Sequence, residues 1–348
     1  MSNLSNFGSQ VCTKYIFAVM HYFLKNYLTT METNILISKF WTRIGALIID
    51  SIILSVIGLI LGLTIQDFLI RVGSYGILLG LTITVLYFTI FNSKLFNGQT
   101  IGKKAFDIQV TDKSGNTLSL RKSLFRTLIL CVPYFLINVE FPGVSIGSAI
   151  FLVKNISCIS LAFGVMVIYI FNKGNRQSLH DLIIGSYVVN IERQEELTEL
   201  PSVTKASYYA FGISVVLLTI FTILGLSQLK STYSDLVSIQ ERISNIDGVL
   251  NAGVSKNTSK VYGQEESTTK SIKAQLWVKK LPSNSDELEN MKETRTAIKT
   301  ILEIEPNIDQ YDIISVTLIK GFNIGIASWK NSFSSQKSPA EWKRLLEK

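Results

Sequence analysis

The chain has 348 residues, of which 47% are hydrophobic and only 17% are charged, and its formal net charge is +8. A soluble protein usually carries about a quarter charged residues, so this composition argues against a soluble globular protein and indicates an integral membrane protein. The positive charge does not indicate nucleic-acid binding, because residues 230–348 hold 17 basic and 15 acidic side chains and the excess lies in the apolar half.

The first 37 residues form a separate N-terminal segment, in which two lysines and a histidine interrupt the apolar residues around YIFAVMHYFLKNYL. The segment lacks the small-residue cleavage site of a signal peptide. Two interpretations are open. Either it is an interfacial helix, or it lies upstream of a natural start at Met31.

Five apolar stretches follow, each close to the roughly 20 residues that cross a bilayer. Residues 38–192 hold four of them, at about 40–64, 74–91, 124–139 and 156–171. Residues 147–155 are either a surface helix or an early extension of the fourth span. Residues 193–206 form a linker, and the fifth span lies within 207–229. We therefore predict a mainly α protein, a polytopic transmembrane helical bundle of about five spans.

Lysine and arginine in the short loops predict the orientation. Residues 1–43, 94–126 and 173–205 hold four, seven and four basic side chains, whereas 64–75 and 140–155 hold one each. We therefore expect a multi-pass protein of the cell membrane with a cytoplasmic N-terminus and a cytoplasmic linker. An odd number of spans then puts residues 230–348 outside.

Residues 230–348 are long enough to form an extracytoplasmic domain. Their patterns predict a helix ending at Gly248, a strand at 272–278, a helix with its N-cap at Ser285, two strands around Gly321, and a final helix near Pro339. The polar stretch 251–270 is expected to be a loop or a hairpin tip. This order of elements implies an α+β domain.

Asp50 lies inside the apolar run of the first span, about two helical turns after Arg43. A charged carboxylate there costs about 2.5–3.5 kcal/mol on insertion scales, so it must be neutral, paired or next to water. Two turns exceed the reach of an i,i+4 pair, so Arg126 at the start of the third span is a better partner than Arg43. Two roles stay open for Asp50: a tether between helices, or an ion- or proton-coupling site.

His180 and Asp181 follow the fourth span on the predicted cytoplasmic side. We expect Asp181 to cap a turn or helix and to pair with Arg43 or Arg126 at the same membrane face. Arg43, Asp50, Asp181 and Arg126 are therefore the candidate residues for ion coupling or for tethering the helices.

Two glycine patterns, GLILG at 58–62 and GILLG at 76–80, predict close packing of the first and second spans. In NGQTIGKKAFDIQVTDKSGNTLSL, Ile108 and Val110 alternate with polar residues before DKSGN, which predicts a cytoplasmic β-hairpin after a glycine-rich turn. The basic side chains near this hairpin are expected to meet anionic lipid headgroups: Lys103, Lys104, Arg121 and Lys122.

No pattern for enzymatic or cofactor chemistry stands out. GQTIGKK lacks the spacing of a phosphate-binding loop, and no serine or cysteine sits in a nucleophile elbow. Three scattered cysteines and two distant histidines predict neither a disulfide framework nor a zinc site. We therefore expect no metal, no cofactor and no enzymatic activity.

Three blocks in this order resemble the RDD family of membrane proteins: RIGALIID at 43–50, the stretch 97–128 that begins NGQTIGKK, and NRQSLHDLIIGSYVV at 175–189. The family is named for an arginine and two aspartates, which the resemblance puts at Arg43, Asp50 and Asp181. It spans about residues 38–190 and covers neither the fifth span nor the outer domain. It implies architecture more than activity, although cation/proton exchange has been proposed for some members.

Two functions are therefore expected. In the first, the bundle transports a cation or a small solute with Asp50 as its ionisable centre, although the spans carry few other polar groups. In the second, the bundle anchors the outer domain and presents it to a partner. We expect the lipid bilayer to surround the bundle. A homo-oligomer and an extracytoplasmic protein partner fit either function. No nucleic-acid partner is expected.

Overall fold

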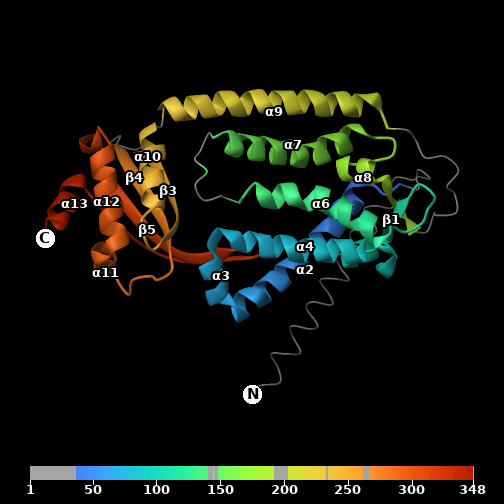
Figure 1. The fold of residues 1–348 in the computed structure, drawn as a ribbon, viewed down its shortest axis with the longest axis horizontal. Helices are drawn as coiled ribbons and strands as arrows, with labels where there is room; N and C mark the ends of the chain where they lie inside the picture. Colours follow the sequence, from blue (N-terminus) through green and yellow to red (C-terminus); the bar gives the residue numbers. More distant parts are fainter. Residues whose placement is uncertain are drawn as a thin grey trace, which may run out of the picture.

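The computed structural model describes residues 37–139, 144, 148–191, 203–232, 234–261 and 267–347, and shows a helical bundle joined to a smaller domain with a β-sheet (Figure 1). The predicted N-terminal segment, apart from its last residue, and most of the linker at 193–206 lie outside the described residues.

Long helices lie side by side in the bundle (Figure 1). They are α2 (Phe40–Thr64), α4 (Gly76–Phe91), α6 (Leu120–Leu136), α7 (Ala149–Phe171) and α9 (Lys205–Thr232). Helix α4 packs against α6, α6 against α7, and α7 against α9. At α7 and α9, Gly164 makes room for Phe211, because a Cβ on Gly164 would lie 2.4 Å from that ring.

Among the described residues, four stretches are long and apolar enough to cross a membrane, by length and composition: Phe40–Thr64, Gln66–Phe91, Ala149–Phe171 and Lys205–Gly225. The second is longer than predicted because α3 (Gln66–Val72) and the 3₁₀ turn η1 (Gly73–Tyr75) precede α4. The fourth predicted span starts at Ala149, so the residues just before 156 extend it rather than form a surface helix. Helix α6 coincides with the third predicted span but has 17 residues and basic side chains near its start, so it is not among the four.

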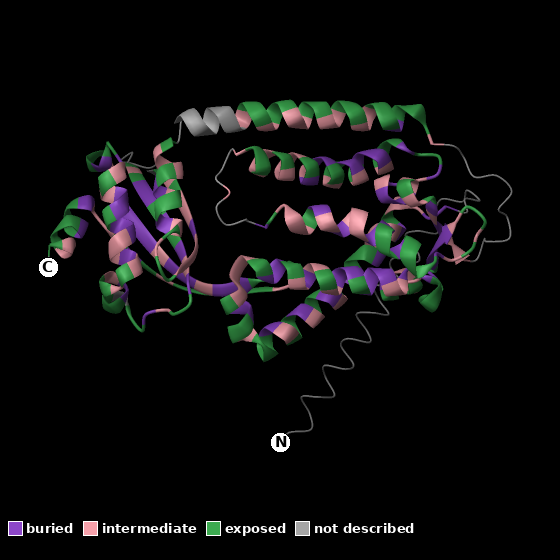
Figure 2. Ribbon diagram, viewed as in Figure 1, coloured by how far each residue is buried: buried purple, intermediate pink, exposed green. Residues whose placement is uncertain are grey.

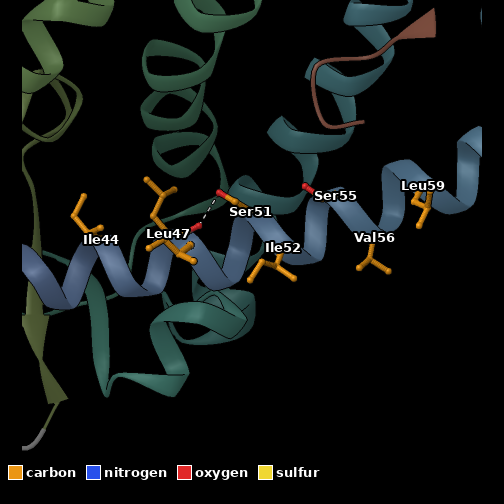
Figure 3. Close-up of a pocket in the computed structure, with 8 residues that line it drawn as sticks. Ile44, Leu47, Ser51, Ile52, Ser55, Val56 and Leu59 are labelled. Carbon is orange, nitrogen blue, oxygen red and sulfur yellow. Dashed lines mark hydrogen bonds between the residues drawn. The ribbon is translucent and has the colours of Figure 1, made fainter. Parts of the chain in front are cut away.

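Helix α2 has two chemically different faces. Its buried residues include a ridge with a spacing of four: Ala46, Asp50, Leu54, Gly58 and Gly62. The opposite face is exposed and forms a shallow apolar groove lined by residues of α2 such as Leu47, Ile52 and Leu59 (Figure 3). Helix α9 has no buried residue from Tyr208 to Gly225, where its side chains are exposed or half-buried (Figure 2). Apolar faces of this kind are stable against lipid.

The end of the bundle that holds the three sequence blocks, called here the motif end, is built from short elements. These are η2 (Lys94–Phe96), α5 (Ile101–Ala105), β1 (Ile108–Asp112), α8 (Leu179–Ile184) and β2 (Ser186–Asn190). Strand β1 pairs antiparallel with β2, from Ile108 opposite Asn190 to Asp112 opposite Ser186. The prediction of a local hairpin is therefore wrong about the partner of strand β1, which is β2. The turn at DKSGN is present, but beyond it only an isolated bridge joins Thr111 to Thr117.

The C-terminal domain, residues 234–347, lies at the opposite end of the bundle, called here the sheet end (Figure 1). Its elements are α10 (Ser234–Ser244), β3 (Val249–Val261), β4 (Ser267–Val278), α11 (Ser285–Asn290), α12 (Lys292–Ile304), η4 (Ile308–Gln310), β5 (Ile313–Asn323), β6 (Ser328–Lys337) and α13 (Pro339–Leu346). The sheet order is β3-β4-β5-β6, with β4 and β5 parallel and the outer pairs antiparallel.

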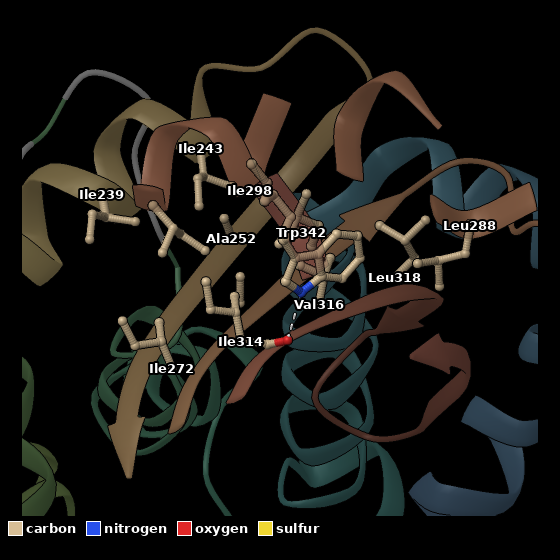
Figure 4. Close-up of a cluster of buried hydrophobic side chains, with 14 of the residues drawn as sticks. Ile239, Ile243, Ala252, Ile272, Leu288, Ile298, Ile314, Val316, Leu318 and Trp342 are labelled. Atoms are coloured by element: carbon tan, nitrogen blue, oxygen red, sulfur yellow. Dashed lines mark hydrogen bonds between the residues drawn. The ribbon is translucent and has the colours of Figure 1, made fainter. Parts of the chain in front are cut away.

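One face of this sheet and the helices form an apolar core of their own (Figure 4). Ile272, Ile298 and Leu318 are fully buried in it. Trp342 of α13 is 1% exposed, and its indole Nε1 donates to the Ile314 carbonyl at 3.0 Å. The predicted α+β class of this region therefore matches its elements.

Three local predictions for this domain are wrong. Of the two alternatives for the stretch 251–270, the loop is wrong: the stretch belongs to the antiparallel β3–β4 hairpin, whose backbone pairing satisfies polar groups although the side chains are polar. The single helix expected after Ser285 is two helices, because Met291 between them is extended. The N-cap is Asn284, whose side chain accepts from Glu287 N at 2.8 Å.

The glycine patterns pack against a different partner from the one predicted. A Cβ on Gly58 would lie 2.7 Å from the Ala327 Cβ, and one on Gly80 would lie 1.7 Å from the Ile324 carbonyl oxygen. Both partners belong to the turn between β5 and β6. At these glycines, part of the C-terminal domain therefore lies between α2 and α4, whereas the two helices contact each other directly nearer to Asp50.

Candidate functional site

The motif end holds a buried ion pair between Arg126 of α6 and Asp181 of α8. Arg126 Nε and Nη2 lie 2.9 and 2.8 Å from Asp181 Oδ1, and the two residues are 4% and 1% exposed. Ser186 Oγ, at the start of β2, donates to the same oxygen at 2.8 Å. Charge-assisted bonds of this kind are among the strongest in proteins, so the pair joins α6, α8 and β2.

Arg43 approaches Asp181 less closely, with Nη1 at 3.9 Å from Oδ2. Its direct hydrogen bonds go elsewhere: Nε to Ser38 Oγ at 2.7 Å, Nη1 to the Arg176 carbonyl at 2.7 Å, and Nη2 to the Val188 carbonyl at 3.2 Å. The guanidinium also lies 5.3 Å from the ring centroid of Tyr169. Arg43 therefore ties the start of α2 to the loop before α8 and to β2. The expected grouping of Arg43, Arg126 and Asp181 at one end of the bundle is present in the structure.

The surroundings keep Asp181 charged and His180 neutral in this cluster. Burial would raise the pKa of Asp181, but the charges of Arg126, His180 and Arg43 outweigh burial and hold the pKa well below its ordinary value. Burial lowers the pKa of His180 to about 3, against the pull of Asp181. His180 is therefore neutral near pH 7, with Nδ1 2.9 Å from Ser178 Oγ, and the permanent charges at this site are those of the arginines and Asp181. Asp181 also accepts from Ser178 N at 3.5 Å, which is the predicted capping role.

Asp50 is 1% exposed and does not pair with Arg126, so the partner predicted for it is wrong. Its Oδ1 accepts from the Tyr87 hydroxyl at 2.7 Å and from the Gly102 backbone N–H at 2.8 Å, and its Oδ2 accepts from the Thr100 hydroxyl at 2.6 Å. Among the described residues, no basic nitrogen lies within ion-pair distance of this carboxylate. Neutral donors from α4 and from the start of α5 thus surround the carboxyl group of Asp50.

Helix α5 can bring these donors to Asp50 because Gly102 has no side chain. A Cβ on Gly102 would lie 2.0 Å from the Ala46 carbonyl oxygen and 2.9 Å from Asp50 Oδ1. Thr100 caps α5 by accepting from Lys103 N at 3.1 Å while its own hydroxyl donates to Asp50. The sequence TIGK, in the second block, therefore supplies a hydroxyl and a backbone N–H to one carboxylate.

Lys103 lies near this site rather than among lipid headgroups. Its half-buried side chain donates from Nζ to Asn92 Oδ1, at the end of α4. The pKa of Lys103 is lowered to about 7, mainly by burial and then by the charge of Arg126, against the opposing effect of Asp50 and Asp181. Lys103 therefore titrates far below the ordinary range of a lysine, and Asp50 is one of the groups that favour its protonated form.

Sequence reasoning missed four residues of this site: Tyr87, Asn92, Thr100 and Gly102. In the sequence, Tyr87 looked like an ordinary aromatic residue, and Asn92 looked like the end of an apolar helix. Thr100 and Gly102 could have been found from the three-residue spacing of an N-capping Thr before Lys103. In the part of the chain that the structure describes, no three His, Cys, Asp or Glu side chains are grouped so as to hold a metal ion.

Comparison with known proteins places this site in a wider group. The model of the RDD family matches residues 37–185, which contain Arg43, Asp50, Arg126 and Asp181. The uncharacterized protein YckC of Bacillus subtilis (strain 168) is 26% identical over 159 residues, which are 45% of this chain and 87% of YckC. No solved structure matches the chain. Residues 37–185, which are less than half of the chain, therefore match the RDD family.

Proposed function

We propose that this protein is a transport protein of the RDD type, in which Asp50 is the ionisable centre for exchange of a small cation. The proposed arrangement has five spans, the motif end in the cytoplasm and the C-terminal domain outside the cell membrane. Helix α6 is the short fifth member, with its basic first turns at the cytoplasmic headgroups.

The observation that carries the proposal is the contrast between the two aspartates. Asp181 is neutralised by Arg126 at 2.8 Å, so its charge is already compensated. Asp50 is as deeply buried, yet its three hydrogen-bond donors are neutral. A buried carboxylate without a contacting cation favours binding a proton or a cation from outside, because either would remove the cost of its burial.

Lys103 supports cation exchange in particular. Burial lowers the pKa of Lys103, and attraction to the negative charge of Asp50 opposes that shift. A cation bound at Asp50 would cancel that attraction, lower the pKa of Lys103 further and favour release of its proton. Oxygen atoms that a small cation prefers are close by, in Asp50, Thr100 and Tyr87.

Ion flux in proteoliposomes tests the proposal through Asp50→Asn, which keeps the shape of the side chain and removes its charge. We expect wild-type protein to carry Na⁺, K⁺ or proton flux and Asp50→Asn to lose it, with both proteins eluting as the same folded species. Asp67→Asn is the matched control, because Asp67 of α3 is exposed and should leave flux unchanged. Equal flux in wild type and Asp50→Asn would contradict the proposal.

A second function rests on the C-terminal domain, whose separate core is not needed to hold Asp50. Its sheet has a polar row on the face away from that core, where Gln275, Thr317 and Ser334 lie side by side on β4, β5 and β6. Such a surface suits a membrane-anchored protein that presents a domain to a partner. Absence of flux for every ion tested would favour this function over transport.

A further inference from the structure

The β5–β6 hairpin reaches from the C-terminal domain into the bundle. Its tip, residues 322–327, is closed by a bond from Ile324 N to the Ala327 carbonyl at 3.0 Å, with Gly325 at φ +80°. Phe322 and Ile324 are 5% and 0% exposed and pack with Leu69 and Ile70 of α3. Phe322 and Ile324 are therefore buried against the bundle, whereas Asn323 and Gly325 of the same tip are exposed, as is most of strand β6 behind it.

The slot that receives the tip is lined by glycines of α2 and α4. Besides the contacts of Gly58 and Gly80 described above, a Cβ on Gly62 would lie 2.6 Å from the Phe322 ring, and one on Gly76 would lie 3.3 Å from the Ile324 Cγ2. The tip thus sits where side chains of any other residue type would stand. Both helices contribute two glycines, at a spacing of four, so the fit involves one face of each helix.

The slot lies on the same ridge of α2 as Asp50. Gly58 follows Asp50 by two further steps of four residues, which is about 12 Å along the helix axis. Leu54 lies between them and forms an apolar cluster with Val85 and Phe88 of α4. Ile326 of the tip packs against this cluster. The hairpin tip and this cluster fill the space between α2 and α4 from the sheet end down to Asp50.

We propose that the hairpin tip is a reversible plug, which closes the sheet-end approach to Asp50 when seated and opens it when the C-terminal domain moves away. The role of this plug in regulating transport rests on the proposed exchange of a cation at Asp50. A plug fits the observed contacts because, among the described residues, the tip and the helices meet in van der Waals contacts and no salt bridge joins them, so they separate without leaving a buried charge unpaired. The C-terminal domain, which keeps its own core, can move as one body with the hairpin.

Water access to the cluster above Asp50 tests the plug without relying on flux. In a background with Cys12, Cys131 and Cys158 replaced by alanine, Leu54→Cys reports reaction with a charged thiol reagent added from the sheet end. We expect slow reaction with the tip seated. Adding Gly80→Val, which would collide with the Ile324 carbonyl, should speed the reaction at least about tenfold, equivalent to a shift of about 1.4 kcal/mol in seating.

Gly212→Val is the matched control, because Gly212 also lies in an apolar helix but has nothing within 4 Å of an added Cβ. Ile324→Asn is a second variant that leaves both glycine-bearing helices unchanged and should also speed the reaction. Equal reaction rates in the Gly80→Val, Ile324→Asn and Gly212→Val backgrounds, in folded protein, would overturn the plug.

A disulfide that locks the plug separates this inference from the proposed function. Gly58→Cys with Ala327→Cys brings together two Cβ positions that lie 2.7 Å apart, which need to separate by only about 1 Å for a disulfide. We expect oxidised protein to lose flux and reduced protein to regain it, whereas Gly58→Cys alone should not respond to oxidation. Unchanged flux in the fully oxidised pair would overturn the plug. If no variant shows flux but Leu54→Cys responds as described, transport fails and the plug stands.

Discussion

Replacing Arg126 with alanine should destabilise the folded protein by about 3–5 kcal/mol, because it leaves the Asp181 carboxylate buried without its partner. Asp181 is 1% exposed, so water cannot replace the guanidinium without opening the motif end. Arg43 cannot take over, since its Nη1 is 3.9 Å away and its hydrogen bonds are made to Ser38 and to backbone carbonyls. Thermal unfolding of detergent-solubilised protein, followed by circular dichroism, measures the loss.

Two further variants show whether the loss comes from the unpaired charge. Arg121→Ala removes an exposed arginine from the same helix and should change stability little, because exposed charges contribute little. Arg126→Leu combined with Asp181→Leu removes both charges and should be more stable than Arg126→Ala alone. If Arg126→Ala unfolds at the same temperature as Arg121→Ala, the ion pair does not hold the motif end together.

Gly102→Ala should cost more than about 3 kcal/mol, above the usual range for overpacking, because the added methyl group collides with backbone rather than with a movable side chain. Its Cβ would lie 2.0 Å from the Ala46 carbonyl oxygen, so α5 must move away from α2. That movement also withdraws the Gly102 N–H and the Thr100 hydroxyl from Asp50. The same thermal measurement detects this, and cation flux should fall with it.

Gly212→Ala provides the comparison for this prediction. Gly212 lies in α9 with open space around an added Cβ, and alanine is the better helix former there, so the variant should be as stable as wild type or slightly more stable. A Gly102→Ala protein that unfolds like the Gly212→Ala protein would show that α5 does not need this close approach.

The sequence predicts that Asp181 pairs with Arg43 or Arg126, without choosing between them, for a simple physical reason. Arg126 starts one helix and Asp181 follows another, so counting apolar spans puts both at the same membrane face, where opposite charges pair. The partners of Asp50 could not be predicted in this way. They are a tyrosine, a threonine and a backbone N–H, and the last two come from α5, whose five residues are too short to show a helical period.

The glycine patterns and strand β3 show a second limit of sequence reasoning. GLILG and GILLG indicate close backbone approach, which is correct, but they do not say which segment approaches. The hairpin tip that fills the slot is more than 200 residues away in the sequence. Strand β3 is polar on both faces for much of its length, so only its pairing with β4 shows that it is a strand.

The two ends of the bundle are separated by α2, in which Arg43 and Gly62 lie about 28 Å apart along the axis, close to the thickness of a bilayer core. Thiol labelling in intact cells, with Cys12, Cys131 and Cys158 replaced by alanine, tests most directly whether a membrane lies between them. Ser114→Cys reports on the motif end and Ser259→Cys on the C-terminal domain, and both positions are exposed. We predict that an impermeant reagent labels Ser259→Cys at once and Ser114→Cys only after the cells are opened. Labelling of both positions from outside, or of Ser114→Cys alone, would contradict a bundle that spans the membrane between these two ends in the proposed orientation.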